Sequence, residues 1–346
     1  MNKRQGVSLP CSRLRLLGLP LFALMMAAFT TIALADNPVA IAIHAGAGTI
    51  EREDLSAEQE IEIRAKLEEA ARAGHEILKK GGSGLDAVSK AVTILEDAPF
   101  FNAGRGAVFN ADGKNELDAS IMDGNTLNAG AVAGVHNVRN PVLLARKVMT
   151  ESVHVMLIGA GAEAFAREQG IAFEDDAWFH TDYRWEQLQK ARAKAKETAA
   201  SGGTPDTWLS TVGAVALDKD GNLAAATSTG GMTNKRWGRV GDVPVIGAGT
   251  YADNESCAVS ATGHGEYFIR ATVARDICAR VQYTGASLQV AADQVVMQKL
   301  VEMGGSGGII SLDPQGHVSL TFNTPGMYRA SIDRDGRVYV GIYNDE

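Results

Sequence analysis

Two pairs of short strand-like segments, each pair joined by a turn, constrain the fold of this chain most. Residues 211–217 and 223–229 flank the polar sequence DKDGN, and residues 308–313 and 317–323 flank the turn Pro-Gln-Gly. Segments of this length with turn residues between them predict β-hairpins, in which neighbouring strands pair antiparallel. We therefore expect both regions to contribute antiparallel sheet.

Helical segments lie before and between these hairpins. Residues 56–80 begin with a Ser-x-x-Gln capping box, and residues 83–96 begin with another capping serine. Two further helices are predicted over 267–283 and 286–303, and the apolar residues 39–44 predict a buried strand. Strands followed by helices and then strands, without regular alternation, indicate a layered α+β architecture.

The first 35 residues have the composition of a targeting segment. Basic residues precede an apolar stretch over 16–31, and the small residues 33–35 offer a cleavage point before Asp36. This order predicts a secretory signal peptide and hence a secreted, periplasmic protein. A membrane anchor is the alternative, but the stretch is short and contains Pro20, which favours removal.

Charge limits the partners of the mature chain. The signal segment carries four basic and no acidic residues, so its removal leaves 29 Lys and Arg against 41 Asp and Glu, a net charge of −12. This balance argues against nucleic acid and anionic membrane surfaces as partners. We expect no membrane association after signal removal and a small molecule as the binding partner.

Only Cys257 and Cys278 remain in the mature chain. Export permits a disulfide between them, but spacing alone does not establish the geometry. We favour two free, buried thiols.

A change of composition marks residues 185–210. Lysines and arginines alternate with Ala and Glu in the first half, which is compatible with a helix, and the second half contains Ser-Gly-Gly-Thr-Pro. The second half has the composition of a flexible linker. This linker ends at Thr211, the first residue of a predicted strand.

Thr211 is a candidate nucleophile because of that position. Cleavage between Ser210 and Thr211 would give Thr211 a free α-amine with a pKa of roughly 7.7–8.0. Such an amine is partly unprotonated near neutral pH and can accept the proton of its own hydroxyl. Taken alone, a threonine at a strand start is an ordinary β-branched strand residue.

Two later segments supply groups that complement this chemistry. In the sequence GRVGD, Arg239 can bind a carboxylate through two parallel hydrogen bonds and Asp242 can pair with an ammonium group. In TGHGE, the corner formed by Thr262 and Gly263 can present donors to an oxyanion. Singly, each has an ordinary explanation as a turn or a solvated charge.

Together these segments resemble one known family. The chain is similar to the plant-type (type III) L-asparaginase / isoaspartyl peptidase (β-aspartyl-peptidase) family of Ntn hydrolases over nearly all of the mature sequence. The matching motifs are TVGAVA at 211–216, TSTGG at 227–231, GRVGD at 238–242 and TGHGE at 262–266. The resemblance implies an α+β, four-layer αββα sandwich cut into chains 36–210 and 211–346, and a dimer of these heterodimers.

The resemblance also implies roles at the matching positions. Thr211 is the nucleophile, Thr229 supports its activation, and Thr262 with Gly263 forms the oxyanion hole that binds the substrate carbonyl. A second group binds the substrate's amino-acid head: Arg239 its α-carboxylate, Asp242 its α-amino group, with Gly265 lining the space.

The implied reaction is hydrolysis of β-aspartyl dipeptides and L-asparagine with release of L-aspartate. A glycosylasparaginase-like amidase is one alternative, and an uncleaved exported binding protein for aspartyl compounds is another. The Gly-Gly-Met run at 230–232 favours the first interpretation. A binding protein would not need both Thr211 and Thr229.

A structural sodium ion is implied by the resemblance as well, whereas no catalytic cofactor is. The implied ligands are backbone carbonyls, which suit a hard cation. They belong to Leu95, Glu96, Ala98, Phe101, Ala103 and Arg105. The residues themselves predict only a turn after a helix.

Two positions depart from the family pattern. Ser210 stands where glycine is common, and the sequence leaves open whether its Cβ slows self-cleavage or has no effect. Ala45 likewise replaces a glycine in the turn after the first strand. His264 lies beside the oxyanion corner, but the N-terminal amine already supplies a base, so we assign no catalytic role to it and expect Glu266 to hold the loop.

Overall fold

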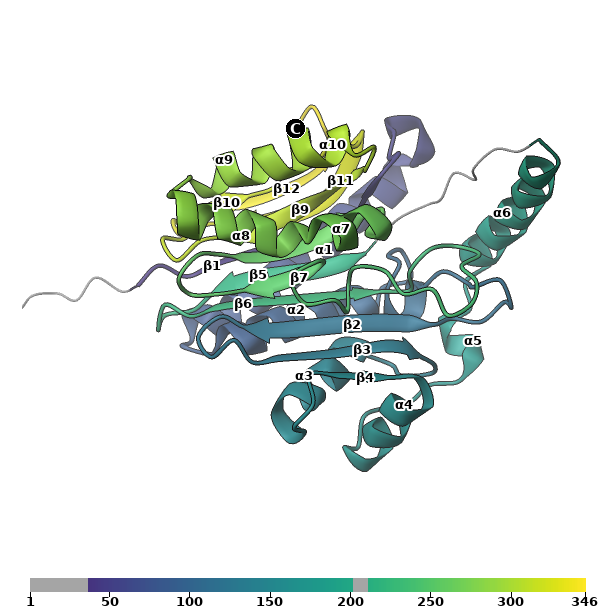
Figure 1. Cartoon of the computed structure of the whole chain (residues 1–346), viewed down its shortest axis with the longest axis horizontal. Helices are drawn as coiled ribbons and strands as arrows, with labels where there is room; N and C mark the ends of the chain where they lie inside the picture. Colours follow the sequence, from purple (N-terminus) through teal and green to yellow (C-terminus); the bar gives the residue numbers. More distant parts are fainter. Residues whose placement is uncertain (1–36, 202–210) are drawn as a thin grey trace, which may run out of the picture. The chain divides into compact units, whose positions relative to one another are not determined.

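The computed structural model describes residues 37–201 and 211–346, and within them two antiparallel-rich sheets are stacked face to face (Figure 1). The larger sheet has the strand order β12-β11-β1-β5-β6-β2-β3-β4, and the smaller has the order β10-β9-β8-β7. The larger sheet comprises β1 (Ala40–Gly48), β2 (Leu117–Asp123), β3 (Ala129–Val135), β4 (Met156–Ile158), β5 (Val212–Leu217), β6 (Leu223–Thr229), β11 (Gly326–Ile332) and β12 (Val338–Tyr343). The smaller comprises β7 (Thr250–Ala252), β8 (Ala258–Gly263), β9 (Gly307–Leu312) and β10 (Val318–Ser319).

Helices cover the outer face of each sheet (Figure 1). The larger sheet is covered by α1 (Ala57–Lys79), α2 (Gly84–Glu96), α3 (Pro141–Glu151) and α4 (Gly159–Glu168), and the smaller by α8 (Val273–Thr284) and α9 (Leu288–Asp293). Shorter or peripheral α-helices are α5 (Asp176–Phe179), α6 (Asp182–Ser201), α7 (Gly265–Ala271) and α10 (Leu300–Glu302), and a π-helical stretch, Gln294–Lys299, joins α9 to α10. The layers are therefore α, β, β and α, which confirms the predicted α+β sandwich.

Alternation along the central strands produces two separate apolar layers. Ala214 and Ala226 face the helices α1 to α3, whereas Val215 and Ala225 face the smaller sheet. Successive strand residues point to opposite faces, so each strand serves both layers. Because many of these residues are alanines, the two sheets approach closely.

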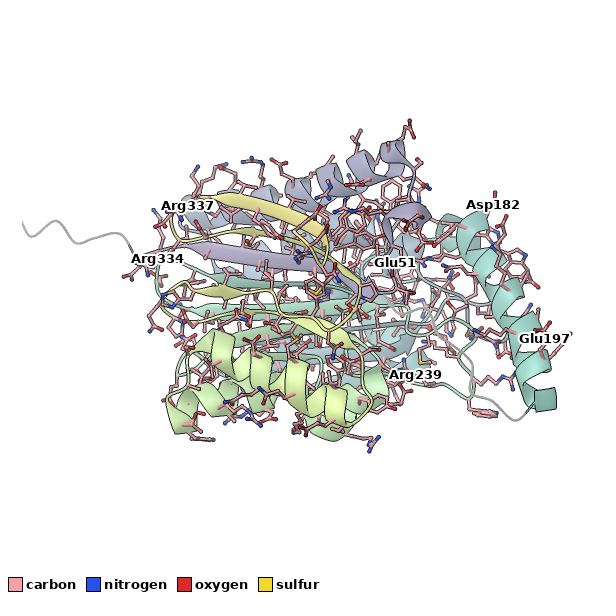
Figure 2. All side chains as sticks on the ribbon, turned by 90° about the horizontal axis from the view of Figure 1, so that it is seen from above. Glu51, Asp182, Glu197, Arg239, Arg334 and Arg337 are labelled. Carbon is pink, nitrogen blue, oxygen red and sulfur yellow. A yellow bond between two sulfur atoms is a disulfide. The ribbon has the colours of Figure 1, made fainter. Side chains whose placement is uncertain are left out.

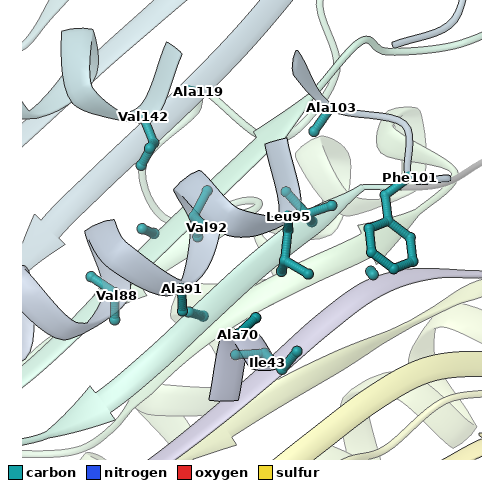
Figure 3. Packing of buried hydrophobic residues seen from close by; sticks show 14 of the residues in the cluster. Ile43, Ala70, Val88, Ala91, Val92, Leu95, Phe101, Ala103, Ala119 and Val142 are labelled. Atoms are coloured by element: carbon teal, nitrogen blue, oxygen red, sulfur yellow. The ribbon is translucent and has the colours of Figure 1, made fainter. Parts of the chain in front are cut away.

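The helix-side layer follows the helical period of α2. Val88, Val92 and Leu95 are fully buried at spacings of four and three residues, and Phe101 closes the end of the layer (Figure 3). Each such side chain contributes roughly 1.5–3 kcal/mol when taken out of water. This packing fixes the loop that follows α2, which later contributes to the site.

The predicted start of the first helix is confirmed, whereas one helix predicted nearer the C-terminus is divided in two. The capping box of α1 is present, because Gln59 N donates to Ser56 Oγ at 3.2 Å and Ser56 N donates to Gln59 Oε1 at 2.9 Å. The helix predicted over 267–283 is instead two helices, α7 and α8. Thr272 breaks it by adopting a left-handed backbone conformation with φ of +48°.

The predicted linker over 185–210 contains more helix than expected. Helix α6 continues through Ser201, beyond the first half that we assigned to helix, because Ala, Lys, Arg and Glu are strong helix formers. The remainder of the predicted linker, 202–210, including Ser210, lies outside the described residues, as does the predicted signal peptide.

The prediction of two free thiols is wrong. Cys257, just before β8, and Cys278, in α8, form a disulfide, and both are fully buried. Their Cα atoms lie 5.2 Å apart because α8 packs directly on β8. Spacing in the sequence could not supply that proximity, which depends on how helix and sheet pack.

Removing this disulfide should weaken the smaller sheet's attachment to its helices. We expect the Cys257→Ala/Cys278→Ala variant to lose roughly 2–4 kcal/mol of unfolding free energy, mainly through the larger conformational freedom of its unfolded chain. Urea unfolding without reductant measures this, and reductant should bring the unaltered protein to the same value. Equal stability of the two proteins without reductant would show that the bond contributes nothing.

Candidate active site

Thr211 and Thr229 meet at one end of the two central strands. Thr211 directly precedes β5, Thr229 ends β6, and the two strands pair with Gly213 opposite Thr227. Thr211 Oγ1 donates to Thr229 Oγ1 at 3.2 Å, and both side chains are buried. The predicted nucleophile and its predicted partner are therefore in direct contact.

Asn102 fixes the turn that follows Thr229. Its Nδ2 donates to Gly231 O at 2.7 Å, and its Oδ1 accepts from Val108 N at 2.9 Å. Gly231 N in turn donates to Thr229 Oγ1 at 2.9 Å. A Cβ at Gly230 would crowd the Asn102 amide, so only glycine fits there. Sequence analysis assigned no role to Asn102, since nothing in the spacing connects it to a threonine more than a hundred residues later.

Thr262 and Gly263 form a stiff corner at the end of β8. Thr262 is fully buried and its Oγ1 accepts from Ala47 N at 3.3 Å. Gly263 has φ of +153°, and a Cβ there would collide with Ser306 O and the Phe268 ring. Glycine is therefore required, and the backbone at this corner is held as an oxyanion site requires.

Arg239, Asp242 and Gly265 lie against one another. A Cβ at Gly265 would lie 2.8 Å from both Arg239 Nη2 and Asp242 Oδ1, so glycine is what lets the guanidinium and the carboxylate approach the backbone here. Figure 2 shows Arg239 at the end of the sandwich from which α6 projects. The structure thus brings together the three residues predicted to bind an amino-acid head.

The surroundings of the Asp242 carboxyl favour the binding of a cation. It is buried, and its Oδ2 has no hydrogen-bond partner among the described residues. Burial raises the pKa of Asp242 to about 7, against the opposing effects of backbone hydrogen bonding and the Arg239 charge. An ammonium group beside the unpartnered Oδ2 would relieve this cost.

Glu266 orients Arg239 from the opposite side. Arg239 Nε donates to Glu266 Oε1 and Nη2 donates to Oε2, both at 2.9 Å, and His264 Nε2 lies 3.3 Å from Oε2. Burial, the largest single effect, would raise the pKa of Glu266, but the hydrogen bonds to Arg239, the charges of Arg239 and His264 and the backbone hydrogen bond of Glu266 together outweigh it and lower the pKa. The ion pair fixes the direction of the Arg239 guanidinium.

A chain of buried hydroxyls lies between the two sheets beneath the nucleophile. His44 Nε2 is 2.8 Å from Ser260 Oγ, which is 2.7 Å from Thr227 Oγ1. Thr250 Oγ1 donates to Thr227 Oγ1 at 2.5 Å, and Ser120 Oγ donates to Thr250 Oγ1 at 2.7 Å. All five side chains are fully buried. Sequence analysis missed this chain because its members come from five different strands.

The two ends of this hydroxyl chain lie at functional positions. Ser120 Oγ also donates to the carbonyl of Val243, next to Asp242, at 2.6 Å. At the other end, burial lowers the pKa of His44 to about 3, although the adjacent Thr211 backbone acts in the opposite direction. The imidazole is therefore neutral at physiological pH. A Cβ at Gly213 would overlap it, so the nucleophile's strand needs glycine there.

Two buried charges beside the site were also not predicted. Asp118 pairs with Thr229 across β2 and β6, and its Oδ1 accepts from Gly134 N at 2.8 Å. Burial raises the pKa of Asp118, while the positive charge of Lys235 opposes that shift. Lys235 Nζ donates to the carbonyl of Glu116 at 3.0 Å. The tip of Lys235 also lies against the glycine turn that follows Thr229.

The loop after α2 has the geometry of a carbonyl cradle. A Cβ at Gly104 would overlap the carbonyl of Glu96, and one at Gly106 would overlap those of Phe101 and Pro99. Several backbone oxygens therefore converge on positions that only glycine leaves open. Within the described part of the chain, no group of three or more His, Cys, Asp or Glu side chains could hold a metal. Backbone carbonyl oxygens are the donors that a hard cation prefers.

Comparison with known proteins agrees with this geometry. Residues 37–342 match the asparaginase family. The chain is 53% identical over 312 residues to an isoaspartyl peptidase of Salmonella typhimurium, covering 89% of this chain and 100% of that protein. It is 53% identical over 309 residues to an isoaspartyl peptidase of Escherichia coli, covering 88% and 96%. An isoaspartyl peptidase/L-asparaginase of Mus musculus is 42% identical over 307 residues, covering 89% and 91%. The chain belongs to the asparaginase family.

The raised pKa of Asp242 gives a pH-dependent stability. In the folded protein the Asp242 carboxyl stays protonated up to about pH 7, whereas in the unfolded chain it ionises near pH 3.8. The free energy of unfolding therefore declines as the pH rises between these two values. We expect Asp242→Asn to remove this decline in the free energy of unfolding. The decline amounts to about 1.4 kcal/mol for each unit by which folding raises the pKa. Urea unfolding at pH 5 and pH 8 measures it, with Thr211→Ala in both proteins to keep a single chain. Parallel declines in the two proteins would contradict the assignment.

Proposed function

We propose that this protein is an N-terminal threonine hydrolase that acts on β-aspartyl dipeptides and L-asparagine and releases L-aspartate. The observation that carries the proposal is the 3.2 Å contact between Thr211 Oγ1 and Thr229 Oγ1. Relatives with the printed activities isoaspartyl peptidase and L-asparaginase support it.

Cleavage between Ser210 and Thr211 starts the reaction sequence by freeing the Thr211 amine. That amine accepts the hydroxyl proton, and Oγ1 attacks the substrate's side-chain carbonyl. Thr262 Oγ1 already accepts the Ala47 N–H, so its own O–H can donate to the oxyanion. The amine then protonates the departing ammonia or amino acid, and water hydrolyses the aspartyl ester.

Substrate recognition uses Arg239 and Asp242, which lie beside Gly265. The α-carboxylate pairs with Arg239, which Glu266 holds in place, and the α-ammonium pairs with the unpartnered oxygen of Asp242. This arrangement selects an aspartyl group with a free amino-acid head. The same head would serve a glycosylasparaginase-like amidase, but the names of the relatives favour the peptidase. A protein that only binds aspartyl compounds would not require the contact between Thr211 and Thr229.

Export and assembly complete the proposal. Residues 1–35 serve as a signal peptide for a periplasmic protein, and the disulfide supports export because such bonds persist in oxidising compartments. No helix of the described residues is long and apolar enough to cross a bilayer. Chains 36–210 and 211–346 form a heterodimer, and two heterodimers associate.

A sodium ion in the loop after α2 is also part of the proposal. The carbonyls that would hold it belong to Leu95, Glu96, Ala98, Phe101, Ala103 and Arg105. The bound cation would keep this loop closed. Asn102, within the same loop, would then stay aligned with Gly231.

The first test concerns maturation. The purified protein should consist of two fragments divided between Ser210 and Thr211, and Thr211→Ala should remain one inactive chain, because both the cleaving hydroxyl and the nucleophile are gone. Intact mass measures this, with Thr150→Ala, an exposed threonine on α3, as the control. An uncut chain that hydrolyses β-aspartyl dipeptides would refute the mechanism.

The second test concerns Thr229. Thr229→Val keeps the shape of the side chain but removes the hydroxyl that accepts from Thr211. We expect kcat of the processed enzyme to fall about 10²-fold, the lower end of proton-transfer contributions, with little change in KM. Steady-state kinetics on L-asparagine measures both constants. A change confined to KM would assign Thr229 to substrate binding instead.

A further inference from the structure

The His44 imidazole lies against the strand that carries Thr211. β1 and β5 pair antiparallel with His44 opposite Gly213, two residues after Thr211. A Cβ at Gly213 would lie 2.6 Å from His44 Nε2, so glycine is what lets the imidazole approach β5. The imidazole is fully buried, and its Nδ1 has no hydrogen-bond partner among the described residues. Which ring nitrogen carries the proton therefore decides what His44 offers to its surroundings.

The hydroxyl chain between the sheets has a direction. Thr250 Oγ1 donates to Thr227 Oγ1 at 2.5 Å. A hydroxyl has a single proton, and Thr227 has two acceptors for its own, Ser260 Oγ at 2.7 Å and the carbonyl of Gly249 at 3.4 Å. The shorter contact is the stronger hydrogen bond. Thr227 therefore donates to Ser260.

This direction fixes the tautomer of His44. Ser260 Oγ accepts from Thr227 and directs its own proton to His44 Nε2, which lies 2.8 Å away. A ring nitrogen that accepts a hydrogen bond carries no proton, so the neutral imidazole holds its single proton on Nδ1. The unpartnered ring nitrogen is thus a buried N–H donor.

The backbone of Thr211 supplies the acceptor for this donor. Burial lowers the pKa of His44 to about 3, and hydrogen bonding to the Thr211 backbone acts against that shift. Only an acceptor favours the protonated imidazole, and the acceptor of a peptide group is its carbonyl oxygen. In the uncut chain this hydrogen bond is not completed, because Nδ1 still lacks a partner among the described residues. A buried N–H without a partner is unfavourable, which favours completion of the bond when Thr211 becomes free to move.

We propose that His44 is a positioning residue for the nucleophile and that its Nδ1–H binds the Thr211 carbonyl once cleavage has freed the Thr211 amine. The inference rests on the proposed hydrolase function. A new chain end is mobile unless it is tied down. A hydrogen bond to its carbonyl would limit rotation of Thr211 and keep Oγ1 beside Thr229 Oγ1, 3.2 Å away. Loss of this bond should therefore lower kcat and leave KM unchanged.

The first experiment observes the tautomer directly by NMR of the processed enzyme labelled with ¹⁵N-histidine. Of the seven histidines, all of which the structure describes, only His44 is fully buried. Its Nδ1 should give the signal of a protonated ring nitrogen and its Nε2 that of a bare one. Neither signal should change between pH 5 and pH 8, because burial keeps the pKa of His44 near 3. A proton on Nε2 would overturn the inference.

The same spectra test the contact with Thr211. The Nδ1 proton should shift downfield between the uncut Thr211→Ala protein and the processed enzyme, because the hydrogen bond forms on cleavage. Identical shifts in the two proteins would overturn the inference. This measurement uses no substitution at His44, so it decides the matter even if His44 variants fail to fold.

Two variants of His44 separate its ring nitrogens. The amide of asparagine reaches the position of Nδ1, whereas that of glutamine reaches the position of Nε2. We expect His44→Gln to lose the donor to Thr211 and to lower kcat for L-asparagine about tenfold, the effect of one lost hydrogen bond, with KM unchanged. His44→Asn keeps that donor and should stay near the unaltered kcat.

Activity is expressed per processed chain, with the processed fraction taken from intact mass. Ser311→Ala, which removes a buried hydroxyl of β9 outside the hydroxyl chain, is the matched control and should leave kcat unchanged. Equal losses of kcat in His44→Asn and His44→Gln would assign His44 a purely structural role and overturn the inference. If the processed, unaltered enzyme hydrolyses neither L-asparagine nor β-aspartyl dipeptides, the proposed function fails, whereas the NMR experiment still tests His44.

Discussion

The hydrogen-bonded chain from His44 through Ser260 and Thr227 is the interaction on which the site depends. It lies between the two sheets, where an unpaired polar group is costly because water is excluded. The sheets can approach closely enough for these bonds only because Gly213 and neighbouring alanines leave space. The chain therefore fixes the distance between β6, which ends at Thr229, and β8, which ends at the corner formed by Thr262 and Gly263.

The functional groups then follow from where strands end. β5 begins immediately after Thr211, β6 ends at Thr229, and β8 ends at Gly263, so the proposed nucleophile, its partner and the proposed oxyanion corner all lie at strand ends. Loops supply the remainder: Asn102 holds the turn after β6, and Arg239 is the proposed partner of the substrate carboxylate. A rigid sandwich with loop-borne recognition explains how a chain of common residue types builds a precise site.

The sequence predicted the parts of the site that are encoded in short motifs. Thr211, Arg239 and Asp242 occur in compact segments whose chemistry is visible locally, as does the capping box of α1, whereas the role of Thr229 came only from the resemblance to a known family. The hydroxyl chain was not predictable in this way, since its members belong to five strands. The disulfide was missed for the same reason, and α6 was underestimated because helix-forming residues were interpreted as part of a linker. Local chemistry is visible in a sequence, whereas proximity across layers is not.

The central claim is that the free amine of Thr211 makes the enzyme active. The most direct measurement follows maturation and activity together, sampling freshly purified uncut protein over time for the fraction of Thr211 N-termini and for the rate of L-asparagine hydrolysis. The account predicts a rate proportional to that fraction, with no activity at zero cleavage. Hydrolysis that is already present before any chain is cut would contradict it.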